Sequence, residues 1–141
     1  MEEKEMVVKE EKSLMEEMKV RNFCSISCET TEEKKTLYNA LEECDVLLND
    51  CVGHTIDIKD VYCEEKEVID EETGEVKTKF RTIIFAQNGQ TYATGSYGVF
   101  NSIRKIMSIF GAPTYSEGEV VVEVAKRPIG NGKSSLILKL V

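Results

Sequence analysis

The chain has 141 residues, enough for one domain of ordinary size, and 41% of them are hydrophobic, enough for a core that needs no metal or disulfide. No apolar run approaches the roughly 18 residues of a membrane span, and residues 1–12 hold no apolar signal segment. We therefore expect a cytoplasmic protein with no membrane partner. The net charge of −8 argues at first against a polyanionic ligand.

The distribution of charge reverses that first impression. Residues 1–76 carry 23 acidic and 9 basic side chains, a net charge of −14. Residues 77–141 carry 3 acidic and 9 basic side chains, a net charge of +6. A chain this asymmetric is able to present an acidic end and a basic face together, so the total charge does not exclude a nucleic-acid ligand.

The cysteines do not indicate a disulfide framework. Their number is odd, none forms a C-x-x-C pair, and we expect reduced, partly buried thiols: Cys24, Cys28, Cys44, Cys51 and Cys63. The alternative is a zinc site built from Cys24, Cys28, Cys51 and His54, but the spacings of these residues match no structural zinc pattern. We predict no metal and no cofactor.

The first third of the chain predicts a tail, a strand and a helix. Residues 1–16 interleave Glu and Lys with few apolar side chains, which is typical of a flexible acidic tail, and residues 17–141 form the predicted domain. Polar and apolar side chains alternate over residues 19–28, which predicts a strand. A helix with an apolar stripe follows, capped by Thr30 or Thr31.

Three consecutive strands are predicted next. Residues 55–67 alternate, with a bulge at Lys59-Asp60 where the alternation shifts by one residue. A polar turn at residues 70–75 returns the chain into a long strand at 76–86. Asn88-Gly89 is a strong hairpin signal that pairs residues 90–94 back across it.

The last third predicts a helix and a closing hairpin. Ser96 caps an apolar stripe that Gly111 and Pro113 end, and Gly130-Asn131-Gly132 joins two strands. The inward side chains of those strands are expected to be Val120, Val122, Val124, Leu136, Leu138 and Leu140. A meander, a helix and a hairpin in this order predict a mainly β, OB-fold-like small antiparallel barrel with two helices, and other small α+β barrels remain the alternative.

A row of cations on the second meander strand is the most informative candidate site. Lys77, Lys79 and Arg81 alternate with other residues, so they project from one face about 7 Å apart. Such a row can follow the phosphates of a nucleic-acid strand. The alternative is a solvated strand edge protected by charge. Phe80 lies on the opposite face, in the core.

Aromatic and further basic residues complete the predicted DNA-binding set. Bases stack on exposed rings, and each tyrosine near the meander is either such a platform or a half-buried barrel residue: Tyr62, Tyr92 and Tyr97. Cations of the second helix and the last hairpin extend the phosphate track: Arg104, Lys105, Lys126, Arg127 and Lys133.

No motif predicts an active site. Gly132-Lys133-Ser134 is similar to the end of a P-loop, but Arg127 stands where that motif requires glycine and a strand follows in place of a helix. The single histidine, His54, has no evident catalytic partner. We therefore predict a protein that is not an enzyme.

The run from Val52 to Gly111, with the terminal "LILKL", resembles a known family. Its markers are Asp60, the Thr73-Gly74 turn, the stretch "YATGS" and the helix "VFNSIRKI". These are similar to the single-stranded-DNA-binding proteins of protein-primed phages and related conjugative elements of Gram-positive bacteria. The resemblance implies an OB-fold that coats single strands, whatever their sequence, during DNA replication or transfer. It assigns no DNA-contacting residue.

The leading prediction is therefore a single-stranded DNA-binding protein whose copies form a homo-oligomer along the strand beside replication or transfer proteins. In this hypothesis the tail at residues 1–16 bridges neighbouring copies or competes with DNA. The alternative is a protein-interaction or scaffold domain that holds a partner with its acidic half, and a small enzyme is the third.

Overall fold

The structure, a computed structural model, describes residues 20–26 and 29–141. Its elements are β1 (Val20–Cys24), α2 (Thr31–Glu42), β2 (Val46–Leu47), the 3-10 turn η1 (Leu48–Asp50), β3 (Thr55–Ile69), β4 (Val76–Ala86), β5 (Thr91–Thr94), α3 (Tyr97–Phe110), β6 (Val121–Gly130) and β7 (Lys133–Leu140). The predicted tail at residues 1–16 and residues 27–28 of the predicted first strand lie outside the described residues.

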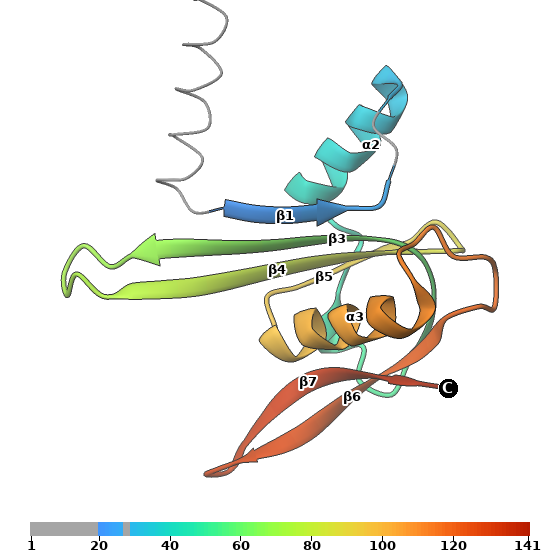
Figure 1. The fold of residues 1–141 in the computed structure, drawn as a ribbon. Coiled ribbons are helices and arrows are strands. Elements are labelled where there is room, and N and C mark those ends of the chain that lie inside the picture. Colours follow the sequence, from blue (N-terminus) through green and yellow to red (C-terminus); the bar gives the residue numbers. More distant parts are fainter. Residues whose placement is uncertain (1–19, 27–28) are drawn as a thin grey trace, which may run out of the picture.

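The strands form one curled, mixed sheet with β3 at its centre (Figure 1). One edge of β3 pairs with β4, and the other pairs first with β6 and then with β1, all antiparallel. β5 lies beside β4 and is followed by β2 in a parallel pairing, while β7 lies beside β6. The β3–β4 register shifts between Ile58 and Asp60, and a bulge of this kind bends the strand and increases its twist.

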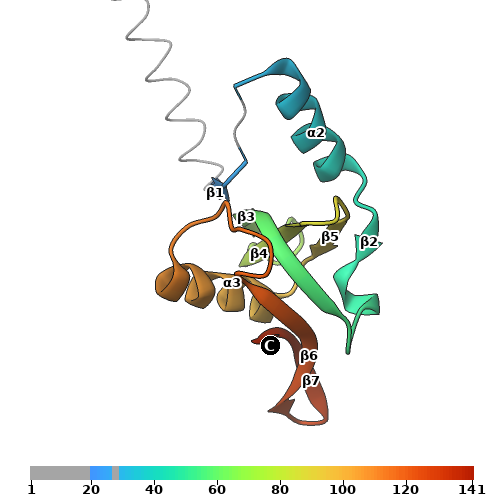
Figure 2. The same ribbon diagram turned by 90° about the vertical axis from the view of Figure 1, so that its right-hand side faces the viewer.

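Helices cover both faces of the sheet, α3 on one side and α2 on the other (Figure 2). The larger apolar cluster lies on the α3 side and includes Ile58, Ile84, Ile103, Val122 and Val124, all at most 1% exposed. The smaller cluster lies on the α2 side and consists of Ala40, Tyr62, Ile83, Phe85 and Ala93. The β3–β4–β5 part of the sheet is therefore buried on both faces over part of its length.

The helices α2 and α3 both begin at a hydroxyl cap. Thr30 Oγ1 accepts a hydrogen bond from the Glu33 N–H (3.1 Å), and Ser96 Oγ accepts one from the Val99 N–H (3.4 Å). Such a cap satisfies one of the backbone N–H groups that a helix leaves free in its first turn. The α3 helix stops at Gly111, whose φ of 87° is readily adopted only by glycine.

α3 takes the place of a neighbouring strand beside β7. Ser96 Oγ donates to the Leu136 carbonyl (3.1 Å), and Ser102 Oγ accepts from the Leu138 N–H (3.2 Å). Gly98 makes this approach possible, because a Cβ at that position would overlap the Leu136 carbonyl oxygen. The hydroxyls of Ser96 and Ser102 thus bond α3 to β7, and the absence of a side chain at Gly98 lets the two come close enough for these hydrogen bonds. This contact holds the C-terminal hairpin in place.

A buried carboxylate joins three segments at the bulge. Asp60 is 7% exposed, and its Oδ1 accepts hydrogen bonds from Ser25 Oγ (2.8 Å) and Thr114 Oγ1 (2.7 Å). Ser25 Oγ also accepts from the Val61 N–H (2.9 Å). The chain after β1, the bulge in β3 and the connection from α3 to β6 are held together by this network.

The predicted order of elements, the bulge and both hairpins are confirmed. Over the described residues the fold is mostly β, a half-barrel with the helices α2 and α3, in agreement with the OB-like prediction. Two details were wrong. The short β2 was missed, and it makes the sheet mixed where an antiparallel one was expected. Leu140, expected inside, is 50% exposed because β7 ends at the rim.

Candidate nucleic-acid interface

The β3–β4 hairpin extends past β5 and, from Glu67 onward, also past β1, as an arm (Figure 1). Its two strands stay paired from Glu64 opposite Arg81 to Ile69 opposite Val76. β5 pairs with β4 only from Thr82 onward, so in the described part of the chain residues 76–81 have no strand on their second edge. We call residues 64–81 the arm.

One face of the arm carries four cations. Side chains alternate along a strand, so the predicted row of Lys77, Lys79 and Arg81 shares the face of Ile83, which packs on the α2 side. Lys66 lies directly opposite Lys79 on the same face. We call these four cations the arm patch. Lys66 was not among the residues predicted from the sequence, although pairing the two predicted strands across the 70–75 turn places it there.

The arm patch includes a shallow hollow. Its volume is about 250 Å³, and it is lined by Glu64, Lys66, Lys79, Phe80 and Arg81. Glu64 is directly opposite Arg81 and is the one acidic residue of this lining. Three of the five lining residues are cations, but the surface that lines the hollow is mostly apolar. The charged ends of these side chains, rather than the hollow itself, therefore suit an anionic group such as a phosphate.

Arg81 also serves the fold. It is half-buried, and its guanidinium donates a hydrogen bond to the Leu41 carbonyl near the end of α2. Lys77 and Lys79 are exposed. The cationic row is thus continuous with the surface that α2 covers, and its two lysines are the freely accessible part.

An aromatic group lies on the opposite face of the arm, beside α3. The Phe80 ring lies 4.9 Å from the ring of Tyr97 and 4.9 Å from that of Phe100 (centroid to centroid), at interplanar angles of 58° and 50°. Tyr97 is 54% exposed, whereas Phe100 is buried. Of the three predicted tyrosines, Tyr97 therefore offers a ring that is both exposed and supported by neighbours.

The other two predicted tyrosines are placed differently. Tyr62 is 7% exposed in the cluster beneath α2, and burial, with a smaller effect of Glu64, raises its pKa. Its ring is not accessible to a base in this arrangement. Tyr92 is half-buried, its hydroxyl donates to Gln90 Oε1 (2.9 Å), and burial raises its pKa.

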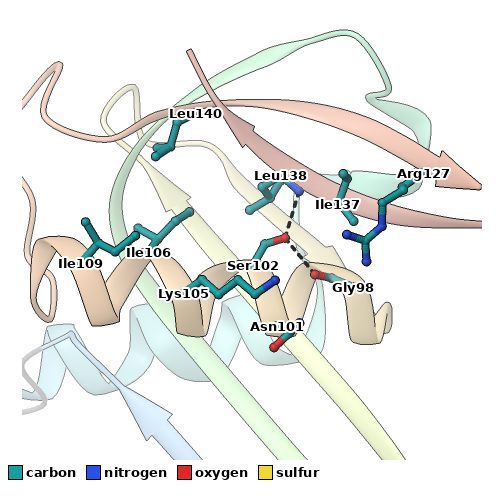
Figure 3. A pocket seen from close by; sticks show the side chains of 10 residues that line it. All are labelled: Gly98, Asn101, Ser102, Lys105, Ile106, Ile109, Arg127, Ile137, Leu138 and Leu140. Atoms are coloured by element: carbon teal, nitrogen blue, oxygen red, sulfur yellow. Dashed lines mark hydrogen bonds between the residues drawn. The ribbon is translucent and has the colours of Figure 1, made fainter.

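The remaining predicted cations are exposed on α3 and on the β6–β7 hairpin: Arg104, Lys105, Lys126, Arg127 and Lys133. Two of them, Lys105 and Arg127, line a groove of about 210 Å³ between α3 and β7 (Figure 3). We call it the α3–β7 groove. The structure thus groups the predicted cations into the arm patch, this groove and isolated positions.

The described residues meet the requirements of neither a metal site nor a membrane-spanning helix. Within residues 20–26 and 29–141, no three His, Cys, Asp or Glu side chains gather into a set that could hold a metal ion. Among the same residues, no helix is long and apolar enough to cross a membrane.

Comparison with known proteins identifies the family. A family model described as phage single-stranded DNA-binding protein matches residues 15–140. The chain belongs to this family. No curated protein and no solved structure matches the chain. The name of the family gives single-stranded DNA binding as its function, and this is a non-enzymatic function.

Proposed function

We propose that the chain binds single-stranded DNA without sequence preference through the arm patch and the ring of Tyr97. The observation that carries the proposal is the pairing of Lys66 with Lys79 across the arm, with Lys77 beside them on the same face. Like charges directly opposite each other destabilise an antiparallel pair. A phosphate between the two lysines removes that repulsion.

The two faces of the arm supply the two contacts that a single strand needs. Cations on the α2 side hold phosphates, and Tyr97 on the α3 side stacks on a base, a contact worth about 1–3 kcal/mol. The free edge of β4 at residues 76–81 separates them, so the strand crosses this edge. A single strand bends around such an edge easily, whereas duplex DNA is stiff over about 150 base pairs. This difference supports a preference for single strands.

Membership of the family supports a role in coating DNA during replication or transfer of a phage or mobile element. In that role the protein acts in the host cytoplasm, next to replication or transfer proteins, and performs no reaction of its own. DNA contacts of the predicted cations on α3 and the β6–β7 hairpin remain predictions, because these residues lie outside the arm patch: Arg104, Lys105, Lys126, Arg127 and Lys133.

The variant Lys66→Glu tests the proposal. It replaces a like-charge pair by an opposite-charge pair with Lys79, so we expect the free energy of unfolding to rise by about 0.2–1 kcal/mol. Affinity for labelled oligo-dT should nevertheless fall roughly tenfold, and the slope of log K against log salt should become shallower by about 0.7 for each phosphate that the variant no longer binds. Stability and binding thus change in opposite directions, which a folding defect cannot produce.

Lys34→Glu, the same charge change on the exposed surface of α2, is the control. It should leave affinity within about twofold, since a charge outside the binding surface acts only through screened, long-range attraction. Equal loss of affinity for oligo-dT in the two variants, or unchanged affinity in Lys66→Glu, would show that the arm patch is not part of the DNA-binding surface.

A further inference from the structure

The α3–β7 groove combines apolar and basic side chains on an exposed surface (Figure 3). Ile109 is 75% exposed and Leu140 is 50% exposed, and both line it. Lys105 comes from α3 and Arg127 from β6, and none of the residues that line the groove is acidic. Exposed apolar side chains beside two cations are typical of a contact site for an apolar segment with negative charge.

The tip of the arm has the complementary composition. Ile69 and Val76 face each other at the last pair of the hairpin and are 67% and 59% exposed. The turn between them holds four carboxylates and no cation: Asp70, Glu71, Glu72 and Glu75. This tip repels phosphates, so in a DNA-binding protein it is suited to a basic partner rather than to DNA.

We propose that the arm tip of one copy of this chain docks in the α3–β7 groove of the next copy. Figure 1 shows the tip projecting away from the body of its own molecule, so it reaches outward to a neighbour. Ile69 and Val76 lie against Ile109 and Leu140, and the turn carboxylates pair with the two groove cations, Lys105 and Arg127. This inference rests on the proposed function, because DNA is what brings the copies together.

The contact is directional, and this fits a coating protein. Tip and groove are different surfaces of one molecule, so each copy offers one of each and the contact repeats without closing. A groove of about 210 Å³ takes only one or two side chains, so the contact is weak between free molecules. Neighbours bound side by side on one strand have a high effective concentration, which populates the contact and makes binding cooperative. The arm patch then holds DNA while the tip of the arm contacts the next copy of the protein.

The test separates binding by one copy from contact between copies. The tip variant Ile69→Ser/Glu71→Gln/Glu72→Gln is titrated with oligo-dT long enough for one copy, and with long poly-dT. Affinity for the short oligonucleotide should match that of the wild-type protein, while the cooperativity factor on poly-dT should fall at least about tenfold. Ile109→Ser in the groove should lower cooperativity in the same way. Sedimentation velocity without DNA, at high protein concentration and low salt, should show weak self-association that is absent in the tip variant.

Exchanging the charges between tip and groove provides the decisive experiment. Lys105→Glu/Arg127→Glu should abolish cooperativity, and adding Glu71→Lys/Glu72→Lys to the same chain should restore it. Glu42→Lys/Glu43→Lys, the same charge change at the exposed end of α2, should not restore it. Wild-type cooperativity in the tip variant, or equal rescue by both lysine pairs, overturns the docking. Lower affinity of the groove variant for the short oligonucleotide also overturns it, because Lys105 and Arg127 then contact DNA. Failure of the wild-type protein to bind the short oligonucleotide refutes the proposed function instead, and the DNA-free sedimentation still decides the docking.

Discussion

Gly98→Ala should destabilise the fold strongly, even though alanine favours a helix. A Cβ at Gly98 would overlap the Leu136 carbonyl oxygen and Ser135 Oγ, and it would come within 3.3 Å of the Ile137 side chain. The carbonyl oxygen belongs to β7, whose position is fixed by its pairing with β6, so the strand cannot yield cheaply. The helix must instead move away from the strand.

The size of the destabilisation follows from the contacts that are lost when α3 moves away from β7. Forcing an extra methyl group into a packed contact costs about 1–3 kcal/mol. Breaking the hydrogen bonds of Ser96 and Ser102 to β7 adds about 1 kcal/mol each. Alanine in a helix returns up to about 1 kcal/mol relative to glycine. We expect a net destabilisation of about 2–4 kcal/mol, a large share of the roughly 5–15 kcal/mol that hold a domain together.

Equilibrium unfolding in urea, followed by far-UV circular dichroism, measures this destabilisation, with Ser108→Ala on the exposed side of α3 as the control. The control should remain within about 0.5 kcal/mol of the wild-type protein. A Gly98→Ala variant that is as stable as the wild type, or more stable, refutes the idea that α3 closes against the β7 backbone.

Two other predictions concern buried groups. Asp60→Ala should cost about 1–2 kcal/mol in urea unfolding, because it leaves the half-buried hydroxyl of Ser25 without its acceptor, whereas the exposed hydroxyl of Thr114 is able to donate to water. A cost below about 0.5 kcal/mol would mean that the network adds little. Burial raises the pKa of the Cys63 thiol from 9.0 to about 11, so the unfolded chain releases this proton at lower pH than the folded chain. The protonated thiol therefore contributes to the free energy of unfolding fully below pH 9, and this contribution of up to about 3 kcal/mol is lost as the pH rises to 11. Cys63→Ala should lack this part of the decline between pH 8 and 10.5, and parallel pH profiles of the two proteins would contradict the assignment.

Local sequence signals predicted most of the fold because the turn, cap and stop residues all favour the same boundaries of helices and strands. The Asn88-Gly89 turn, the hydroxyl of Ser96 and the stop at Gly111 each specify a boundary from a few neighbouring residues. The β2 strand was not predictable in this way, because two residues carry no periodicity and its parallel pairing with β5 depends on distant chain. Leu140 was placed inside by its alternation, but alternation does not indicate where a sheet ends.

The site was predicted in part for the same reason. Alternation correctly put Lys77 and Lys79 on one face, since it depends on one strand alone. Lys66 joins them through cross-strand register, which required combining two strands with their turn. The burial of Tyr62 could not be predicted from its own strand, because α2 covers it from another part of the chain. The complementary tip and groove likewise appear only once the arm and the α3–β7 packing are known.

The most direct test of the DNA-binding surface is the salt dependence of binding. Labelled oligo-dT and a duplex of the same length are titrated at several salt concentrations with the wild-type protein and with Lys66→Gln/Lys77→Gln/Lys79→Gln. We expect the wild-type protein to prefer the single strand, and the slope of log K against log salt to become shallower by about 2 in the variant, at about 0.7 for each phosphate contact. Equal slopes for the two proteins, or equal wild-type affinity for duplex and single strand, would contradict the account.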